Sequence, residues 1–115
     1  MYNLKDMHTV NIKPLSVNRA WMGRRFKTNE YKIYERQLQL ILPALTLPEA
    51  PYSVIYHVSY SNRGSDIDNF LKQFNDCLQK KYNFDDKHIF HMEVFKHIVK
   101  KGLEKIEFNI KHYAL

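Results

Sequence analysis

Hydrophobic and polar residues follow regular spacings along the first half of the chain, and these spacings predict two strands and a helix. The alternation in Thr9–Lys13 predicts a short strand, and residues 14–27 are expected to form a loop. Hydrophobic residues at helical spacing predict a helix over residues 31–42, with Thr28 as its N-cap. The β-branched and aromatic segment 52–60 predicts a strand. One face of that strand would carry Val54, Tyr56, Val58 and Tyr60.

The second half of the chain predicts one further helix and two further strands. The helix is expected to begin around Asp66–Asp68, and its buried stripe would be Phe70, Phe74, Cys77 and Leu78. Residues 89–99 and 103–110 predict strands, which Lys100–Gly102 would join as an antiparallel hairpin. The resulting order is β-α-β-α-β-β. We therefore expect an α+β fold with a single domain, residues 1–115, in which helices cover a mixed sheet.

The composition narrows the class of protein. The 115 residues are 44% hydrophobic and 26% charged, as in an ordinary globular domain rather than a disordered segment. The net charge of +6 draws the protein towards polyanions such as nucleic acids, although a soluble protein can be basic without binding them.

Cysteine content and hydropathy predict a cytoplasmic protein without a membrane partner. Cys77 is the only cysteine, so no disulfide can form within the chain, which suits a reducing compartment. The first residues show no apolar signal region. The longest apolar stretch, residues 38–47, is interrupted by Gln39 and Pro43 and is too short to span a bilayer.

Carboxylates are concentrated in two short segments. Asp66 and Asp68 stand where the second helix is expected to start, and Lys72 follows Asp68 by about one helical turn. Asp85 and Asp86 precede the next strand. Mg²⁺ prefers such oxygen ligands, and it neutralises charge on phosphates and lowers the pKa of bound water. If the helix folds back onto its sheet, the two segments would form a magnesium site beside Lys72.

The same residues also have a purely structural interpretation. Asp66 or Asp68 would only cap a helix, and Asp85–Asp86 would only form a polar turn. Lys72 would pair with Asp68 or Asp76 on the helix surface. The spacing of these residues does not decide between a metal site and the structural roles.

These segments resemble motifs of the RusA-type Holliday junction resolvases. Asp66–Lys72 resembles the family's D-x-D-N-x-x-K motif. Phe84–Ile89 resembles its D-D-x-Q-V motif at a matching separation, with His88 where the family usually has glutamine. Upstream, Pro14–Asn18 and Thr28–Lys32 resemble the N-terminal loop and the first helix of the family. The resemblance therefore extends over most of the chain.

The resemblance implies a homodimeric, Mg²⁺-dependent endodeoxyribonuclease that resolves four-way DNA junctions in recombination and repair. It assigns metal binding to Asp66, Asp68 and Asp86, and it assigns an auxiliary catalytic role to Lys72. Phosphodiester hydrolysis by water would leave a 5′ phosphate. A two-fold dimer would explain paired cuts in a two-fold symmetric junction.

Two neighbouring residues are expected to support this site from outside the metal ligands, Asp85 and His88. Mn²⁺ is a further candidate for the metal. Two other functions stay open. One is a protein that binds branched DNA without cutting it, and the other is an accessory protein whose acidic cluster is structural.

A basic stretch supplies candidate contacts to DNA, because residues 13–36 hold seven lysines and arginines against two glutamates. The candidates for contact with phosphates or bases are Arg19, Trp21, Arg24, Arg25, Lys27 and Arg63. The alternative is a solvated charged loop with Trp21 packed into the core. A second basic run, Lys96, Lys100, Lys101 and Lys105, would either extend the DNA-binding surface or form a solvated sheet edge.

Overall fold

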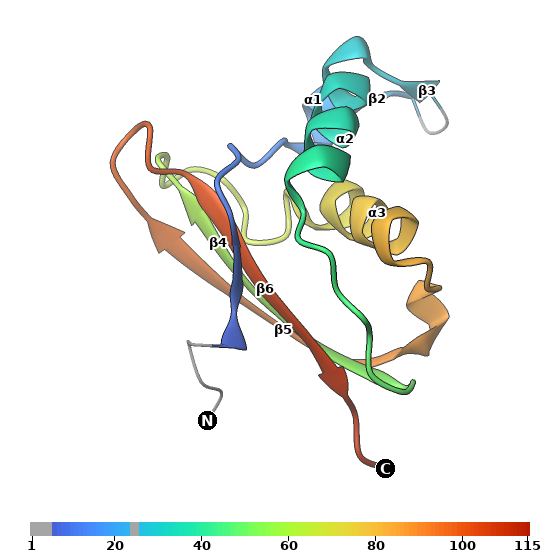
Figure 1. Cartoon of the computed structure of the whole chain (residues 1–115). Helices are drawn as coiled ribbons and strands as arrows, with labels where there is room; N and C mark the ends of the chain where they lie inside the picture. Colours follow the sequence, from blue (N-terminus) through green and yellow to red (C-terminus); the bar gives the residue numbers. More distant parts are fainter. Residues whose placement is uncertain (1–5, 24–25) are drawn as a thin grey trace.

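The strand predicted at residues 52–60 lies inside a four-stranded sheet. The computed structural model describes residues 6–23 and 26–115. In it, β4 (Tyr52–Tyr60) pairs in parallel with β5 (Ile89–Ile98) and antiparallel with β6 (Lys105–His112). β1 (His8–Val10) pairs antiparallel with β6, so the strand order is β1-β6-β4-β5 (Figure 1). The predicted mixed sheet and α+β class are therefore confirmed.

β5 and β6 are not neighbours, which corrects the hairpin expected at Lys100–Gly102. β4 lies between them, and the connection of residues 99–104 crosses the end of β4. There the Val99 amide donates a hydrogen bond to the Tyr60 carbonyl at 2.8 Å. Gly102 has a φ of 95°, a left-handed conformation that glycine adopts without steric cost. The turn reverses the chain as predicted, but contacts with β4 decide which strands pair.

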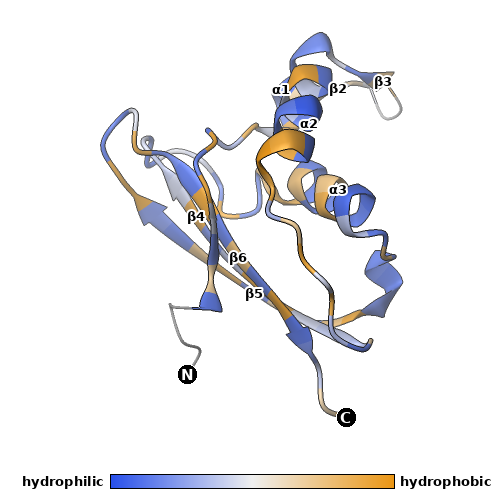
Figure 2. Ribbon diagram, in the orientation of Figure 1, coloured by the Kyte–Doolittle hydropathy of each residue, from blue (hydrophilic) through white to orange (hydrophobic). Residues whose placement is uncertain are grey.

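Two helices, α2 (Asn29–Ile41) and α3 (Leu71–Tyr82), cover one face of the sheet (Figure 1). Hydrophobic and hydrophilic residues alternate along the strands, as this one-sided cover requires (Figure 2). The Tyr56 side chain of β4 is fully buried on the covered face, with its ring 5.7 Å from that of Phe70 and 5.9 Å from that of Phe74. None of the helices that the structure describes has the length and apolar composition of a membrane-spanning segment.

The start of α2 agrees with the prediction. The Thr28 hydroxyl oxygen accepts a hydrogen bond from the Tyr31 amide at 3.1 Å, which satisfies one of the free amides at the helix start. Tyr31, Tyr34 and Leu38 form the buried stripe of the helix. Their burial against the sheet and α3 fixes the orientation of α2.

The start of α3 differs from the prediction. The helix begins at Leu71, after turns over residues 67–70. The Leu71 amide donates to the Asp68 carbonyl at 3.0 Å, and the Asn69 amide donates to the Asp66 carbonyl at 3.1 Å. Neither aspartate side chain caps the helix. Asp66 and Asp68 therefore lie in a loop that precedes the helix.

The segment expected to be a loop, residues 14–27, contains three short elements. They are α1 (Val17–Ala20), β2 (Trp21–Met22) and β3 (Phe26–Lys27), and the last two pair antiparallel. The Ser16 hydroxyl oxygen accepts from the Arg19 amide at 3.3 Å and caps α1. Elements this short give no periodic signal in a sequence.

A buried glutamine fastens this N-terminal segment to α3. The Gln73 side-chain amide donates to the carbonyl oxygen of Leu15, and also to that of Asn69 at 2.8 Å. The Tyr31 hydroxyl donates to the Gln73 carbonyl at 3.4 Å. These bonds bring the N-terminal segment, α2 and the start of α3 together next to the acidic loop.

Candidate functional site

The first acidic segment lies at the carboxyl end of β4. Asp66 and Asp68 are exposed in the loop between β4 and α3. Burial raises the pKa of the nearby Tyr60 phenol to about 12, and the charges of Asp68 and Asp66 add to this effect. The two carboxylates therefore lie close to Tyr60, the last residue of the central strand.

A lysine of β5 holds this loop from the sheet side. The Lys96 ammonium donates to the carbonyl oxygen of Arg63 at 2.9 Å and to that of Ser65. The Asn62 side-chain oxygen accepts from the Gly64 amide at 2.7 Å. These bonds fix the backbone that leads into the acidic segment. Lys96 thus has a structural role within the fold, whereas its expected part in a DNA footprint stays a prediction.

Lys72 lies on the first turn of α3, and its ammonium is stacked on an aromatic ring. Its Nζ atom is 4.6 Å from the centroid of the Trp21 ring, a cation–π contact. The Trp21 ring packs edge-on against Tyr31, with centroids 5.1 Å apart and an interplanar angle of 82°. Trp21 is half-buried against the core. Packing of Trp21 into the core was the alternative to a DNA contact in the sequence analysis. Two predicted site residues, Lys72 and Trp21, are therefore in contact.

The second acidic segment lies beside the later turns of α3. The Asp86 amide donates to the side-chain oxygen of Gln79 at 2.8 Å. The Gln79 side-chain nitrogen in turn lies 3.3 Å from Oδ1 of Asp76. Burial raises the pKa of Asp76, the charge of Asp86 raises it further, and Lys72 opposes both effects. The charges of both Lys72 and Asp86 therefore act on the carboxylate of Asp76.

Our sequence interpretation assigned Asp76 only a surface pairing role. Its helical spacing from Lys72, four residues, was the available signal. What the sequence did not indicate is that Asp76 is partly buried between α2 and α3, near Lys27 and Glu35.

The first acidic segment precedes α3 in the chain, and the second follows the end of this helix (Figure 1). α3 has 12 residues, which at a rise of 1.5 Å each corresponds to a length of about 18 Å. Within residues 6–23 and 26–115, no group of three or more histidine, cysteine, aspartate or glutamate side chains is arranged to hold a metal ion. Asp66 and Asp68 precede α3 and Asp86 follows it, and the assignment of all three to one metal site stays a prediction.

The residues present fit a divalent cation in part. Asp66 and Asp68 offer two carboxylates from an exposed loop. Mg²⁺ in proteins is commonly bound by one or two carboxylates, with waters and substrate phosphates as the other ligands. The pair is therefore a chemically suitable donor set. Asp86, the third residue that the resemblance assigns to the metal, follows the far end of α3, and its part in the site stays a prediction.

His88 is the last residue of a short 3₁₀ helix, Asp86–His88, that leads into β5, and Asp85 is the N-cap of this helix. The Asp85 carboxylate accepts from the Lys87 amide at 3.0 Å, and this bond is the main reason that the pKa of Asp85 is lowered. The His88 amide donates to the Asp85 carbonyl at 3.0 Å. Asp85 thus caps this short helix, whereas the structural alternative had expected a polar turn here, and His88 is exposed beside it.

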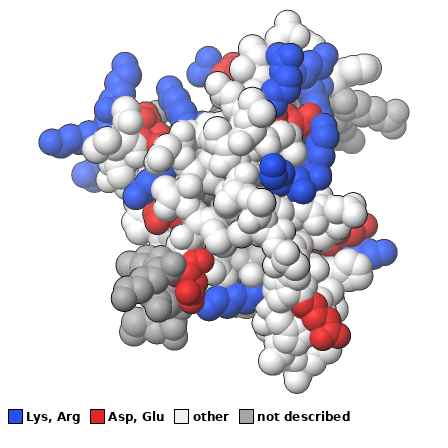
Figure 3. Space-filling model, in the orientation of Figure 1, with Lys and Arg blue, Asp and Glu red and all other residues white. Residues whose placement is uncertain are grey.

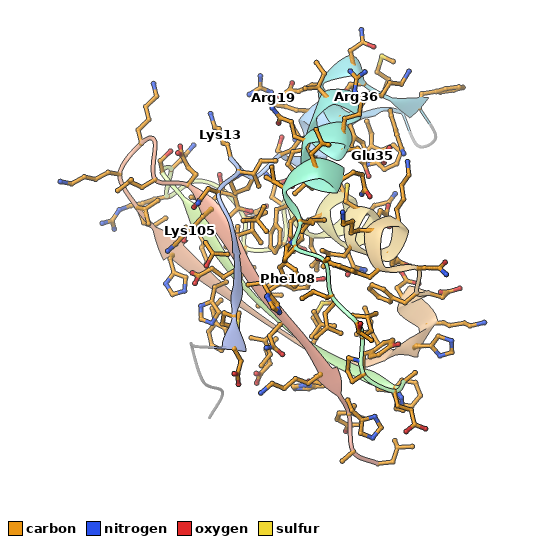
Figure 4. All side chains as sticks on the ribbon, viewed as in Figure 1. Lys13, Arg19, Glu35, Arg36, Lys105 and Phe108 are labelled. Carbon is orange, nitrogen blue, oxygen red and sulfur yellow. The ribbon has the colours of Figure 1, made fainter. Side chains whose placement is uncertain are left out.

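Two of the predicted DNA contacts are paired with glutamates of α2. The Arg19 guanidinium lies 3.2 Å from the carboxylate of Glu30, and the Lys27 ammonium lies 2.8 Å from that of Glu35. Figure 4 shows Arg19 and Glu35 beside α2. These pairs neutralise part of the positive charge that the sequence places in this region. DNA contact by Arg19 or Lys27 would have to compete with the glutamates.

The other predicted basic contacts are exposed or lie outside the described residues. Arg63 is exposed next to the acidic loop, and Lys100 and Lys101 are exposed on the turn before β6. Arg24 and Arg25 lie outside the described residues. On the face shown in Figure 3, basic side chains gather at the upper left and upper right, with uncharged side chains between them.

Comparisons with known proteins assign no family to this chain. A scan against models of protein families found no match, and a search of curated proteins found no significant match. The resemblance to RusA-type resolvases therefore rests on the motifs quoted above, and what it implies about function stays a prediction.

Proposed function

We propose that this protein is a Mg²⁺-dependent endodeoxyribonuclease that acts on four-way DNA junctions. The observation that carries the proposal is the segment Asp66–Lys72. Two exposed carboxylates stand in a loop that Lys96 holds against the sheet, and Lys72 stands in the first turn of the helix that follows. The basic composition of the chain supports an anionic substrate.

The proposed roles follow from the chemistry of these side chains. A divalent cation on Asp66 and Asp68 would neutralise phosphate charge and lower the pKa of a bound water. The Lys72 ammonium would stabilise negative charge that develops on the phosphate, and its stacking on Trp21 limits where that charge can lie. Arg63, exposed just before the loop, would bind an adjacent phosphate.

The proposal includes a homodimer and a cytoplasmic location, as the resemblance and the composition imply. A two-fold dimer matches the symmetry of a junction that is cut in two strands. Sedimentation or light scattering at several protein concentrations would test the dimer, and a monomer at every concentration would remove this part of the proposal.

A DNA-binding or accessory protein without cleavage activity is the second candidate. It is favoured by the positions of Asp66 and Asp68 before α3 and of Asp86 after it, because three clustered carboxylates would be the stronger sign of a nuclease. Such a protein would bind branched DNA with a strong dependence on salt but would not cut it.

Replacement of Asp68 by asparagine separates the candidates, since the exposed side chain can change without loss of packing. The proposal predicts that D68N lowers the junction-cutting rate by about 100-fold or more, whereas junction affinity measured in EDTA stays within a few-fold. Glu93→Gln, an exposed carboxylate on β5, is the matched control and should keep both properties. Unchanged cutting by D68N would contradict the proposed site.

Asp86→Asn asks a separate question, whether the third aspartate of the motif takes part. Loss of cutting in D86N with normal binding would mean that Asp86 reaches the site only in the DNA complex or the dimer. Full activity of D86N would limit the site to Asp66, Asp68 and Lys72.

A further inference from the structure

A pocket of about 600 Å³ lies next to the acidic loop, outside the site described above. Its walls come from the N-terminal segment 12–19, the α2 helix, the end of β4 and the loop that follows β4. Ser65 and Asn69, which stand on either side of Asp66 and Asp68 in the chain, both line it. A molecule that occupies this pocket would therefore lie beside the candidate cleavage site.

The charges in the pocket wall are balanced. Arg19 and Glu30 both line the pocket and form an ion pair with atoms 3.2 Å apart. The other two charged residues are Lys13 and Glu104. The Glu104 carboxylate accepts hydrogen bonds from the Ser61 hydroxyl at 2.7 Å and the Gly102 amide at 2.8 Å. A bare phosphate or carboxylate would gain little net attraction here, so the charge favours an uncharged ligand.

The rest of the wall combines apolar surface with hydrogen-bonding groups. Ile33, although it lines the pocket, is 50% exposed, so it leaves an apolar surface open to a ligand. Side-chain amides of Gln37, Asn62 and Asn69 also line the wall. Gln37 offers both a donor and an acceptor, whereas the side-chain oxygens of Asn62 and Asn69 already accept from the Gly64 and Val17 amides and leave only their nitrogens as donors. A flat, uncharged ring with donors and acceptors on its edge is complementary to such a wall.

Two tyrosines, Tyr34 and Tyr60, also line this wall. Both residues are more than nine-tenths buried, and hydrogen bonds from the backbone of Leu15 to Tyr34 and of Phe70 to Tyr60 partly oppose the effect of burial on their pKa. Burial raises the pKa of both phenols, to about 12 for Tyr60, so both carry their proton at neutral pH.

We propose that this pocket receives one unpaired nucleobase of a DNA strand. The exposed Arg36, next to Gln37 on α2, would hold a phosphate beside that base (Figure 4). A base in a duplex would first have to leave the stack, so single strands and branch points are preferred over duplex. This inference needs no cleavage activity, and it stands or falls independently of the proposed function.

The test compares two single-stranded DNA probes of equal length, one with all its bases and one with an abasic site at its centre. Both probes carry the same phosphates, so a difference in affinity reports the base. Fluorescence anisotropy with the full chain in EDTA should give a Kd about ten-fold weaker for the abasic probe. Ile33→Ala and Gln37→Ala should bring the affinity for the complete probe close to the abasic value.

Leu40→Ala is the matched control, because Leu40 is an 85% exposed apolar residue of the same helix that does not line the pocket. It should bind both probes as the unchanged protein does. Equal affinity of the unchanged protein for the two probes would mean binding through phosphates only and would overturn the proposal. A base-dependent difference that survives in Ile33→Ala and Gln37→Ala would place the base elsewhere and would also overturn it. Circular dichroism would confirm that the variants are folded.

Discussion

The ammonium of Lys72 lies 4.6 Å from the centroid of the Trp21 ring. A cation–π contact of this kind restricts where the long lysine side chain places its charge. Because Trp21 itself is fixed edge-on against Tyr31, the ring acts as a stable support for the charge. Trp21 is therefore a positioning residue for Lys72 in the proposed nuclease.

Trp21→Leu should lower kcat for junction cutting by about ten-fold and leave KM nearly unchanged, since a misplaced charge weakens the transition state more than substrate binding. Trp21→Phe keeps an aromatic face and should restore most of the rate. The shielded NMR signals of the Lys72 ε-methylene protons should move to ordinary positions in the leucine variant. If those signals are ordinary in the unchanged protein, the stacking is absent in solution.

Asp76 should make the stability of the protein depend on pH. Its pKa is raised, mainly by burial, so the fold favours the protonated acid. The stabilisation that this preference provides is complete below the ordinary pKa of 3.8 and is lost as the pH rises through the higher pKa of the folded state. Asp76→Asn should therefore raise the free energy of unfolding at pH 7, on the order of 0.5 kcal/mol.

Urea unfolding of Asp76→Asn and the unchanged protein at pH 7 and pH 3 measures this difference. The advantage of the asparagine variant should disappear at the lower pH. A variant that is less stable at pH 7 would show that attraction to Lys72 outweighs the burial of the Asp76 charge.

Glu35 should have the opposite dependence on pH. Burial alone would raise its pKa, but hydrogen bonds from Lys27 and Lys80 and the charges of both lysines lower it. The stabilisation is present above the ordinary pKa of 4.5 and is lost as the pH falls through the lower pKa of the folded state. Glu35→Gln should reduce the free energy of unfolding at pH 7, on the order of 1 kcal/mol, and much less near pH 3.

Glu49→Gln, at an exposed glutamate outside this ion-pair network, is the control for a general effect of charge. In a protein with net charge +6, removal of any carboxylate increases self-repulsion, and the control measures that contribution. Equal destabilisation by the two substitutions would contradict a specific role of the Glu35 ion pairs.

The parts of the fold that could be predicted from the sequence are those that local pattern determines. The β-branched and aromatic residues of the segment 52–60 predicted the strand β4, and the cap at Thr28 predicted the start of α2. The pairing of β5 and β6 was predicted wrongly, because the turn at Lys100–Gly102 is as suitable for a hairpin as for a connection that crosses β4. Strand order depends on contacts distant in sequence, which periodicity does not contain.

In the candidate site, too, the features set by local sequence could be predicted, and those set by contacts distant in sequence could not. The sequence indicated that Asp66, Asp68 and Lys72 stand together, since they are close along the chain. It could not indicate whether Asp86 reaches them, because this depends on the direction and length of α3. The contact between Trp21 and Lys72 was also not predicted, since it arises where the N-terminal segment packs against α3.

The most direct test of the account is incubation of the purified protein with a synthetic four-way junction and a linear duplex of matching sequence, each with and without Mg²⁺. The account predicts paired cuts in the junction only when Mg²⁺ is present, products with 5′ phosphates, and little cutting of the duplex. Tight, salt-sensitive binding of the junction with no cut strand, at any Mg²⁺ or Mn²⁺ concentration, would contradict it.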